Sequence, residues 1–271
     1  MARYCPLFSG SSGNCTYIGT ASGGILIDAG VSARRLEKAL RARNIDPASI
    51  AAVFVTHEHG DHIAGLEVFA GRYCCAVFGS AGTLGALPQS LSRTVLTPKT
   101  DGYETRLAGY DCEGVEAAGM WVTAFETPHD ARQSTGYIIR TSDGRRIGVA
   151  TDIGQITDLI RSELRGCDLV HIESNHDLPL LNAGPYPYFL KKRILADTGH
   201  LSNSACAREL ENFAKTGTAR FVLSHLSREN NTPELAYAAA SSAMKAAGLT
   251  ERLDYQLWVA APEDRTGVIV F

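Results

Sequence analysis

Several features that mark specialised classes of protein are missing from this sequence of 271 residues. No apolar run approaches the roughly 20 residues that a membrane-spanning helix needs, and the N-terminus lacks a long apolar segment. The formal net charge is −3, so no overall positive charge attracts nucleic acid, and such binding must come from a local patch or from metals. The sequence therefore predicts a protein that makes no contact with a membrane.

Cysteine spacings typical of a disulfide framework are also lacking. The seven cysteines are odd in number and include no Cys-x-x-Cys pair. Cys74 and Cys75 are adjacent within the strand-like run 74–78, where we expect both to be small core residues of a reduced protein. Together with the missing apolar segment, this use of cysteine predicts a cytoplasmic location.

Linkers, internal repeats and low-complexity segments are absent as well. The hydrophobic content of 45% and the charged content of 20% are ordinary for a globular protein, and the length is enough for a sizeable core. Short apolar runs alternate with helical patterns, so we expect an α/β protein with a single domain over residues 1–271. The expected helices include residues 33–43, 81–87, 156–164, 204–214 and 233–247.

What the sequence does contain is a dense group of metal-binding residue types, at His57, His59, Asp61 and His62. The apolar run 50–55 before them predicts a buried strand, and the glycine after His59 breaks the pattern, so we expect a loop at the strand end. Imidazole and carboxylate groups are ligands of Zn²⁺ and its first-row neighbours. Four such residues in one loop exceed what one catalytic metal usually takes from one segment, which indicates two adjacent metals.

Further residues of these types also follow short apolar runs, namely His129, Asp152, Glu173 and His225. Each alone would more often be structural, but the ends of neighbouring strands converge on one edge of an α/β sheet, where sites are usually built. Asp28 ends another apolar run and is expected either to orient a ligand histidine or to form a turn. The repetition predicts one site assembled from several strand ends.

A cluster of small polar residues, 9–14, lies between two short apolar runs. This composition predicts a hairpin or a bulged turn. Two interpretations stay open: the cluster is only a turn, or its backbone approaches a metal site or a phosphate closely.

The order of these residues resembles that of the metallo-β-lactamase superfamily, over almost the whole chain from Asp28 to His225. Within the superfamily the chain resembles the YycJ/WalJ group, which is described as exonuclease-like and is similar to tRNase Z in its site. The segments that carry this closer resemblance are 9–14, 173–177, 199–203 and 224–227. The resemblance implies an αββα four-layer sandwich of two mixed sheets flanked by helices.

The resemblance also implies a centre with two divalent ions, Zn²⁺ or Mn²⁺, and a set of ligands for each ion. Asp61 is expected to be catalytic as well as a ligand. The implied ligands are His57, His59 and His129 for one ion, Asp61, His62 and His225 for the other, and Asp152 as the carboxylate that bridges both.

The ligand types favour phosphodiester hydrolysis. Lactam-hydrolysing members typically carry a cysteine where this chain has Asp152, and a hard carboxylate bridge suits two close cations that grip a phosphodiester. The ions would bring the pKa of a bridging water near neutral and supply hydroxide as the nucleophile. Neither the β-CASP insertion nor the tRNase Z arm is evident, so the resemblance implies an exonuclease-like nuclease with DNA favoured over structured RNA.

Two other classes of function stay open. A metal-dependent hydrolase of a small cyclic phosphodiester, thioester or lactone would use the same ligands but need no basic track leading to the site. A non-catalytic regulator with this fold is the third class, and the intact ligand set argues against it.

Glu173 and His200 are the expected source of the proton that the leaving alkoxide needs. A carboxylate next to an imidazole raises the pKa of the imidazole and orients it, so His200 could act as a general acid. The alternative is a pair that only shapes its loop.

Substrate contacts are expected from Asn175, His176 and Lys192. Lys192 belongs to the basic run 191–193, which could grip a nucleic-acid backbone while Tyr186 or Tyr188 stacks on a base. The competing interpretation of the basic run is a solvated helix end.

Overall fold

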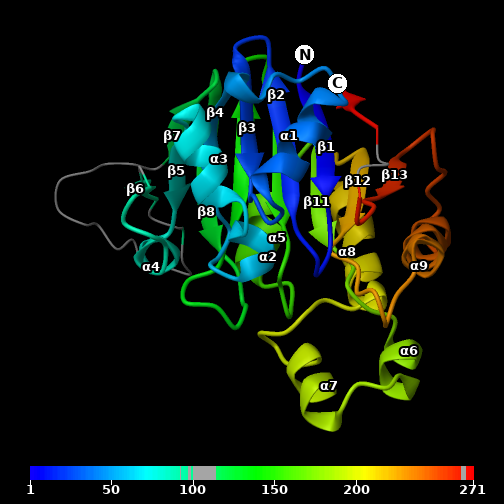
Figure 1. The fold of residues 1–271 in the computed structure, drawn as a ribbon. Coiled ribbons are helices and arrows are strands. Elements are labelled where there is room, and N and C mark those ends of the chain that lie inside the picture. Colours follow the sequence, from blue (N-terminus) through cyan, green and yellow to red (C-terminus); the bar gives the residue numbers. More distant parts are fainter. Residues whose placement is uncertain (92, 97–98, 100–113, 264–266) are drawn as a thin grey trace.

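The structure, a computed structural model, describes residues 1–91, 93–96, 99, 114–263 and 267–271. The described residues form two seven-stranded sheets that pack face to face, with helices on both outer faces (Figure 1). One apolar core lies between the sheets, and each sheet shares a further core with the helices that cover it. This arrangement confirms the predicted αββα sandwich.

The two sheets repeat one pattern of strand pairing, although the sequence contains no evident repeat. Across each sheet, three antiparallel pairs are followed by three parallel pairs. The first sheet consists of β14 (Ile269–Val270), β1 (Arg3–Phe8), β2 (Cys15–Thr20), β3 (Gly23–Ile27), β4 (Ile50–Phe54), β5 (Ala76–Gly79) and β6 (Arg93–Val95). The second consists of β7 (Val115–Ala117), β8 (Met120–Glu126), β9 (Thr135–Thr141), β10 (Arg146–Ala150), β11 (Leu169–Glu173), β12 (Arg220–Ser224) and β13 (Gln256–Val259).

Most of the expected site residues follow the ends of the central parallel strands in the two sheets. β11 and β12 are almost wholly buried, because helices cover one face of the sheet and the other sheet covers the second. This double burial explains why the strands appear in the sequence as short apolar runs. Since parallel strands share one direction, the residues that follow them meet at one edge of the sandwich.

Helices that cover the sheets bury one apolar stripe each. In α1 the side chains of Leu36, Ala39 and Leu40 are buried as expected, and the helix ends at Arg41 rather than at residue 43. The helices are α1 (Ala33–Arg41), α2 (Gly60–Ile63), α3 (Leu66–Tyr73), α4 (Ala81–Gly85), α5 (Asp158–Leu164), α6 (Leu178–Ala183), α7 (Tyr188–Ile194), α8 (Asn203–Lys215) and α9 (Pro233–Ala246), with a 3₁₀ turn η1 (Pro47–Ser49). The predicted ends of α8 and α9 lie within one residue of those observed.

Two short helices, α6 and α7, were not expected from the sequence. The side chain of Asp177 caps α6 by accepting a hydrogen bond from the Leu180 N–H, and α7 begins directly after Pro187. The basic run 191–193 forms the last turn of α7, which places it at a helix end and leaves its role as a phosphate contact to be tested. We call residues 178–194 the arm, which projects from the sandwich at the end where α2 lies (Figure 1).

Local predictions had mixed outcomes. The hairpin around residues 9–14 is confirmed as the connection between β1 and β2, and residues 142–144 connect the antiparallel pair β9 and β10. Cys75 is buried, but the prediction for Cys74 was wrong: this residue is exposed and ends α3 in a left-handed conformation, with φ of 53°. A strand expected near Tyr103 lies outside the described residues.

Every helix among the described residues is too short or too polar to span a lipid bilayer.

Candidate metal centre

Three residues of the site adopt a left-handed backbone within two residues of the end of a strand. Asp28, Asp152 and His225 have φ values of 62°, 55° and 55°. Residues other than glycine rarely adopt this conformation, although aspartate and histidine are enriched among those that do. The left-handed turn redirects the chain where β3, β10 and β12 end, at the edge where the two sheets meet the loops.

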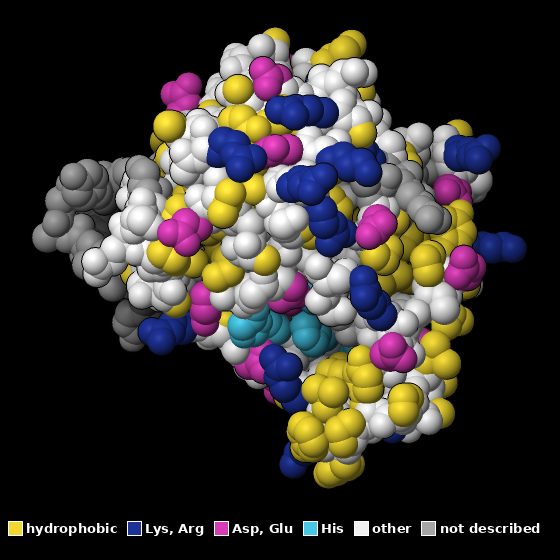
Figure 2. All heavy atoms as spheres, in the orientation of Figure 1, with side chains coloured by type: hydrophobic (Ala, Val, Ile, Leu, Met, Phe, Trp, Pro, Cys, Tyr) yellow, Lys and Arg dark blue, Asp and Glu magenta, His cyan; other side chains and the backbone are white. Residues whose placement is uncertain are grey.

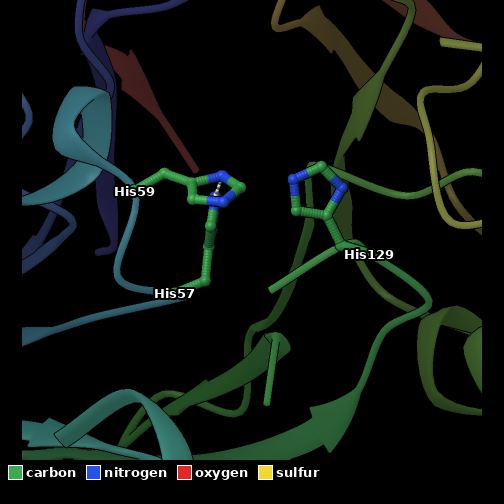
Figure 3. A group of neighbouring side chains, drawn as sticks. All are labelled: His57, His59 and His129. Atoms are coloured by element: carbon green, nitrogen blue, oxygen red, sulfur yellow. Dashed lines mark hydrogen bonds between the residues drawn. The ribbon is translucent and has the colours of Figure 1, made fainter. Parts of the chain in front are cut away.

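Three imidazoles form the first group of possible metal ligands (Figure 3). One ring nitrogen from each of His57, His59 and His129 lies within 4.8 Å of the others. His57 and His59 come from the loop between β4 and α2, and His129 comes from the loop after β8. Burial, together with the neighbouring imidazoles, holds the pKa of His57 well below its usual value, and burial lowers the pKa of His129. Both rings are therefore neutral near pH 7, which is the form that binds a metal.

A second group consists of Asp61, His62 and His225, whose candidate ligand atoms also lie within 4.8 Å of one another. The Asp61 Oδ2 atom is 3.6 Å from His62 Nε2 and 3.7 Å from His225 Nε2. The Nε2 atom of His225 is buried and has no hydrogen-bond partner. A buried, unpartnered nitrogen that faces a carboxylate fits a metal ligand better than a purely structural histidine.

Asp152 lies between the two groups. Its Oδ1 atom is 3.4 Å from His225 Nε2 and 3.7 Å from His129 Nε2, and its Oδ2 atom is 3.3 Å from His62 Nε2. The side chain is only 2% exposed, and Oδ2 lacks a hydrogen bond. A buried carboxylate is costly unless positive charge faces it, and cations held by the imidazoles on both sides of Asp152 would supply that charge. Nitrogen and oxygen donors arranged in this way fit two divalent ions that share one carboxylate.

Asp28 contacts the site from behind. Its Oδ2 atom is 2.7 Å from Nδ1 of His62, and its Oδ1 atom accepts a hydrogen bond of 2.8 Å from the Thr56 N–H. Although burial lowers the pKa of His62, the carboxylates of Asp152 and Asp28 raise it to about 9. Of the two roles left open by the sequence, the geometry matches the one in which Asp28 orients a histidine.

Replacing Asp28 with asparagine is expected to lower metal affinity about 10- to 100-fold, as is typical when a partner of a ligand histidine is removed. The amide keeps the size of the side chain and tolerates the left-handed backbone, so the protein should still fold. Competition with a chromogenic chelator measures the affinity. The matched control is Asp158→Asn on α5, whose side chain is 96% exposed; an equal loss in both variants would contradict the orienting role.

The hairpin residues 9–14 approach the centre closely. The Asn14 side-chain nitrogen is 3.0 Å from His62 Nε2, and the Ser9 hydroxyl accepts a hydrogen bond of 2.8 Å from the His225 N–H. At the neighbouring strand end, a Cβ atom on Gly30 would lie 1.7 Å from the Asp61 carbonyl oxygen, so only glycine fits there. The structure therefore favours the second interpretation, in which small residues permit close approach to the site.

Glu173 joins the second group to His200. Its Oε1 atom is 2.8 Å from His200 Nδ1 and 2.9 Å from His225 Nδ1, and its Oε2 atom accepts hydrogen bonds from the N–H groups of Ile153 and Leu201. Glu173 is fully buried, and although burial raises its pKa, the imidazoles of His200 and His225 lower it well below the usual value. The ionised carboxylate thus fixes two histidine rings at once, a double role that the sequence did not suggest.

A cavity of about 410 Å³ opens onto this centre. His57, His62 and Glu173 are fully buried behind its wall. Among the residues considered from the sequence, those that line the cavity are His59, Asp61, His129, Asp152, Asn175, Tyr186, Arg193, His200 and His225. The cavity is thus large enough for a phosphodiester group, and it exposes one face of each candidate metal group.

The three expected substrate contacts occupy different environments. Asn175 lines the cavity and donates a hydrogen bond of 2.8 Å to the His225 carbonyl oxygen. His176 is buried, with its Nδ1 atom 3.4 Å from the Asn175 side-chain oxygen, and it does not line the cavity. Lys192 lines a separate hollow on the arm.

Arg193 is the residue of the basic run that reaches the cavity, and the sequence did not single it out. Its guanidinium group forms an ion pair with both carboxylate oxygens of Asp130, the residue that follows His129. The side chain is still 52% exposed. The only indication of Arg193 in the sequence was the basic run 191–193. The run does not show which of its three side chains faces the metal cavity.

Comparisons with known proteins agree with this geometry. Residues 24–226 match the family described as "Beta-lactamase superfamily domain". The exodeoxyribonuclease YycJ of Bacillus anthracis is 31% identical over 247 residues, which cover 91% of this chain and 90% of that protein. The exodeoxyribonuclease WalJ of Streptococcus pneumoniae is 31% identical over 265 residues, 97% of this chain and 96% of that one. The zinc-bound structure of PqqB from Methylobacterium extorquens is similar in fold, with a TM-score of 0.66 at 14% identity over 100% of both chains.

Proposed function

Because the chain belongs to the β-lactamase superfamily, we propose that this metal-dependent hydrolase cleaves phosphodiester bonds in DNA. The observation that carries the proposal is the buried carboxylate of Asp152, which faces both groups of histidines. The relatives named exodeoxyribonucleases support DNA as the substrate and removal of nucleotides from an end as the mode of cleavage.

The proposed ligands of the first ion are His57, His59 and His129, those of the second are Asp61, His62 and His225, and Asp152 bridges the two. Two divalent ions held there would supply a hydroxide nucleophile near neutral pH and neutralise the charge of the phosphate. Imidazole and carboxylate donors suit either Zn²⁺ or Mn²⁺, and we propose that one of these is native.

In this proposal, residues of the chain position the substrate and move one proton. Arg193 contacts a phosphate oxygen at the mouth of the cavity, with Asp130 fixing the guanidinium. The proton for the leaving alkoxide comes from His200, whose pKa is lowered by burial but raised overall by the adjacent carboxylate of Glu173. His176 supports Asn175 instead of meeting the substrate itself.

Hydrolysis of a small phosphodiester, thioester or lactone is the second candidate. The observation in its favour is the cavity volume of about 410 Å³, within the range of roughly 300–1,000 Å³ that is usual for small-molecule sites. A small substrate would fill this cavity without reaching the separate hollow that Lys192 lines.

Cleavage of labelled single-stranded DNA, duplex DNA, RNA and bis(p-nitrophenyl) phosphate, with Zn²⁺ or Mn²⁺ added, tests the proposal. We expect mononucleotide release from DNA and close to two metal equivalents per chain, with the ions about 3.5–4 Å apart. Elemental analysis counts the metal, and X-ray absorption measures the separation. Turnover of a thioester or lactone without cleavage of any phosphodiester would support the second candidate, and a single metal equivalent would contradict the two-ion centre.

We also propose a cytoplasmic location. Among the described residues, Cys15, Cys74, Cys75, Cys167 and Cys206 are free thiols, and four of these five are buried. Free thiols in these numbers suit a reducing compartment.

A further inference from the structure

A second hollow, of about 560 Å³, lies on the arm next to the metal cavity. We call it the arm groove. Tyr186 lines both the arm groove and the metal cavity, so the two hollows adjoin at this residue. The residues that line the arm groove are Asn182, Tyr186, Tyr188, Lys191, Lys192, Leu195 and Ala196.

The charge of the arm groove is positive. Lys191 and Lys192 line it, and no acidic residue does so in the part of the chain that the structure describes. The Lys191 ammonium donates a hydrogen bond of 2.7 Å to the Asn182 carbonyl oxygen, which ties α7 to α6. Lys192 forms no ion pair with any described residue and is exposed. In a chain with a net charge of −3, this local cation is available for an anionic ligand.

The same surface carries unusually exposed aromatic rings. Tyr188 is 79% exposed and Phe189 is 74% exposed, whereas most of the described aromatic side chains are buried. Figure 2 shows an apolar cluster at the lower edge of the molecule, close to the visible histidines and flanked by Lys and Arg side chains. Exposed rings beside a cation are the features that hold unpaired nucleobases, because stacking binds the base and the cation binds the backbone.

We propose that the arm groove binds a nucleotide of single-stranded DNA beside the bond that is cleaved. The nucleobase stacks on Tyr188 and Tyr186, and Lys192 contacts a flanking phosphate. A base paired within a duplex offers no free face to these rings, so the groove selects single strands or frayed ends. This inference rests on the proposed function, because it takes the strand in the arm groove to continue into the metal cavity through Tyr186.

Binding of a fluorescent, single-stranded phosphorothioate oligonucleotide to the metal-loaded protein tests the proposal, because phosphorothioate linkages resist cleavage during the measurement. Tyr188→Ala is expected to weaken binding about 5- to 150-fold, the loss typical of one stacked base. Tyr188→Phe keeps the ring and should bind like the wild type. Lys192→Ala should make the dependence of log affinity on log salt shallower by about 0.7, the value for one phosphate contact on a single strand.

Lys38→Ala is the matched control, since Lys38 is also an exposed lysine in the last turn of a helix but lies on α1. It should change neither affinity nor salt dependence. Wild-type binding by both Tyr188→Ala and Lys192→Ala would overturn the inference. So would an altered oligomeric state in sedimentation without a change in DNA affinity, which would assign the arm to a protein contact. If the wild type cleaves DNA while the variants bind normally, only the role of the arm fails; if it cleaves no phosphodiester, the proposed function itself fails.

Discussion

Replacing Asp152 with asparagine is expected to lower phosphodiester hydrolysis by at least about 10³-fold, because charge stabilisation by the metal ions is worth several kcal/mol. The amide has the shape of the carboxylate but no charge, so it cannot balance two cations between His129 on one side and His62 and His225 on the other. Asparagine also tolerates the φ of 55° at this position, so the variant should fold.

Steady-state cleavage of DNA, metal content and thermal melting measure this outcome together. We expect lost activity and reduced metal content with a cooperative melt. Asp158→Asn, the exposed control on α5, should match the wild type in all three measurements. Full activity with two metal equivalents in Asp152→Asn would exclude this residue as the bridge, and a collapsed melt would mean that its role is structural.

Replacing His200 with alanine is expected to slow DNA cleavage about 10²- to 10⁴-fold, the usual contribution of a general acid. With bis(p-nitrophenyl) phosphate the loss should be much smaller, because p-nitrophenolate leaves without needing a proton. His200 lies near Asp152, Glu173 and His225 in a further group that could hold a metal, but it belongs to neither of the two proposed ligand sets, so we expect metal content to stay unchanged. Equal losses on both substrates, or loss of metal, would assign His200 to ligation or structure.

Glu173→Gln should cost at least as much as His200→Ala, because the Glu173 carboxylate holds both His200 and His225. The double variant should be little slower than Glu173→Gln alone, since residues that act as one unit lose activity non-additively. Glu173→Gln should also weaken metal binding through His225. Glu163→Gln on α5 is the control, since this largely buried glutamate pairs with Lys99 rather than with the site. Additive losses in the double variant would separate the two residues.

Local patterns in the sequence predicted an α/β protein and the convergence of site residues, whereas the αββα sandwich was implied by the resemblance to the metallo-β-lactamase superfamily. A buried parallel strand must be a short apolar run, and the residue that follows it must lie at the sheet edge, so His57, Asp152 and His225 could be expected at one place. The double contact of Glu173 depends on the relative position of β11 and β12, which no local pattern encodes.

Other features depended on geometry that residue types do not carry. The arm was missed because α6 and α7 are one to two turns long, too short for a helical period to emerge. Arg193 rather than Lys192 lines the metal cavity. Successive residues of a helix point about 100° apart, and a run of three cations does not show which of them faces the cavity. Cys74 was predicted to lie in the core but is exposed, because it ends α3 in a left-handed turn. The strand-like run 74–78 did not indicate this turn.

The left-handed backbone at Asp28, Asp152 and His225 lowers the stability of the fold at positions whose side chains are proposed to serve the reaction. Each such residue costs the folded state about 1–3 kcal/mol that glycine would not. Backbone strain alone would therefore favour glycine at these three positions, whereas the proposed roles of the side chains in the site favour the residues that are present. Among homologues, those that have become pseudoenzymes should drift toward glycine or asparagine at these three strand ends. We therefore expect the residues at these three positions to differ between homologues that hydrolyse phosphodiesters and homologues that do not, which activity assays on members with glycine there would test.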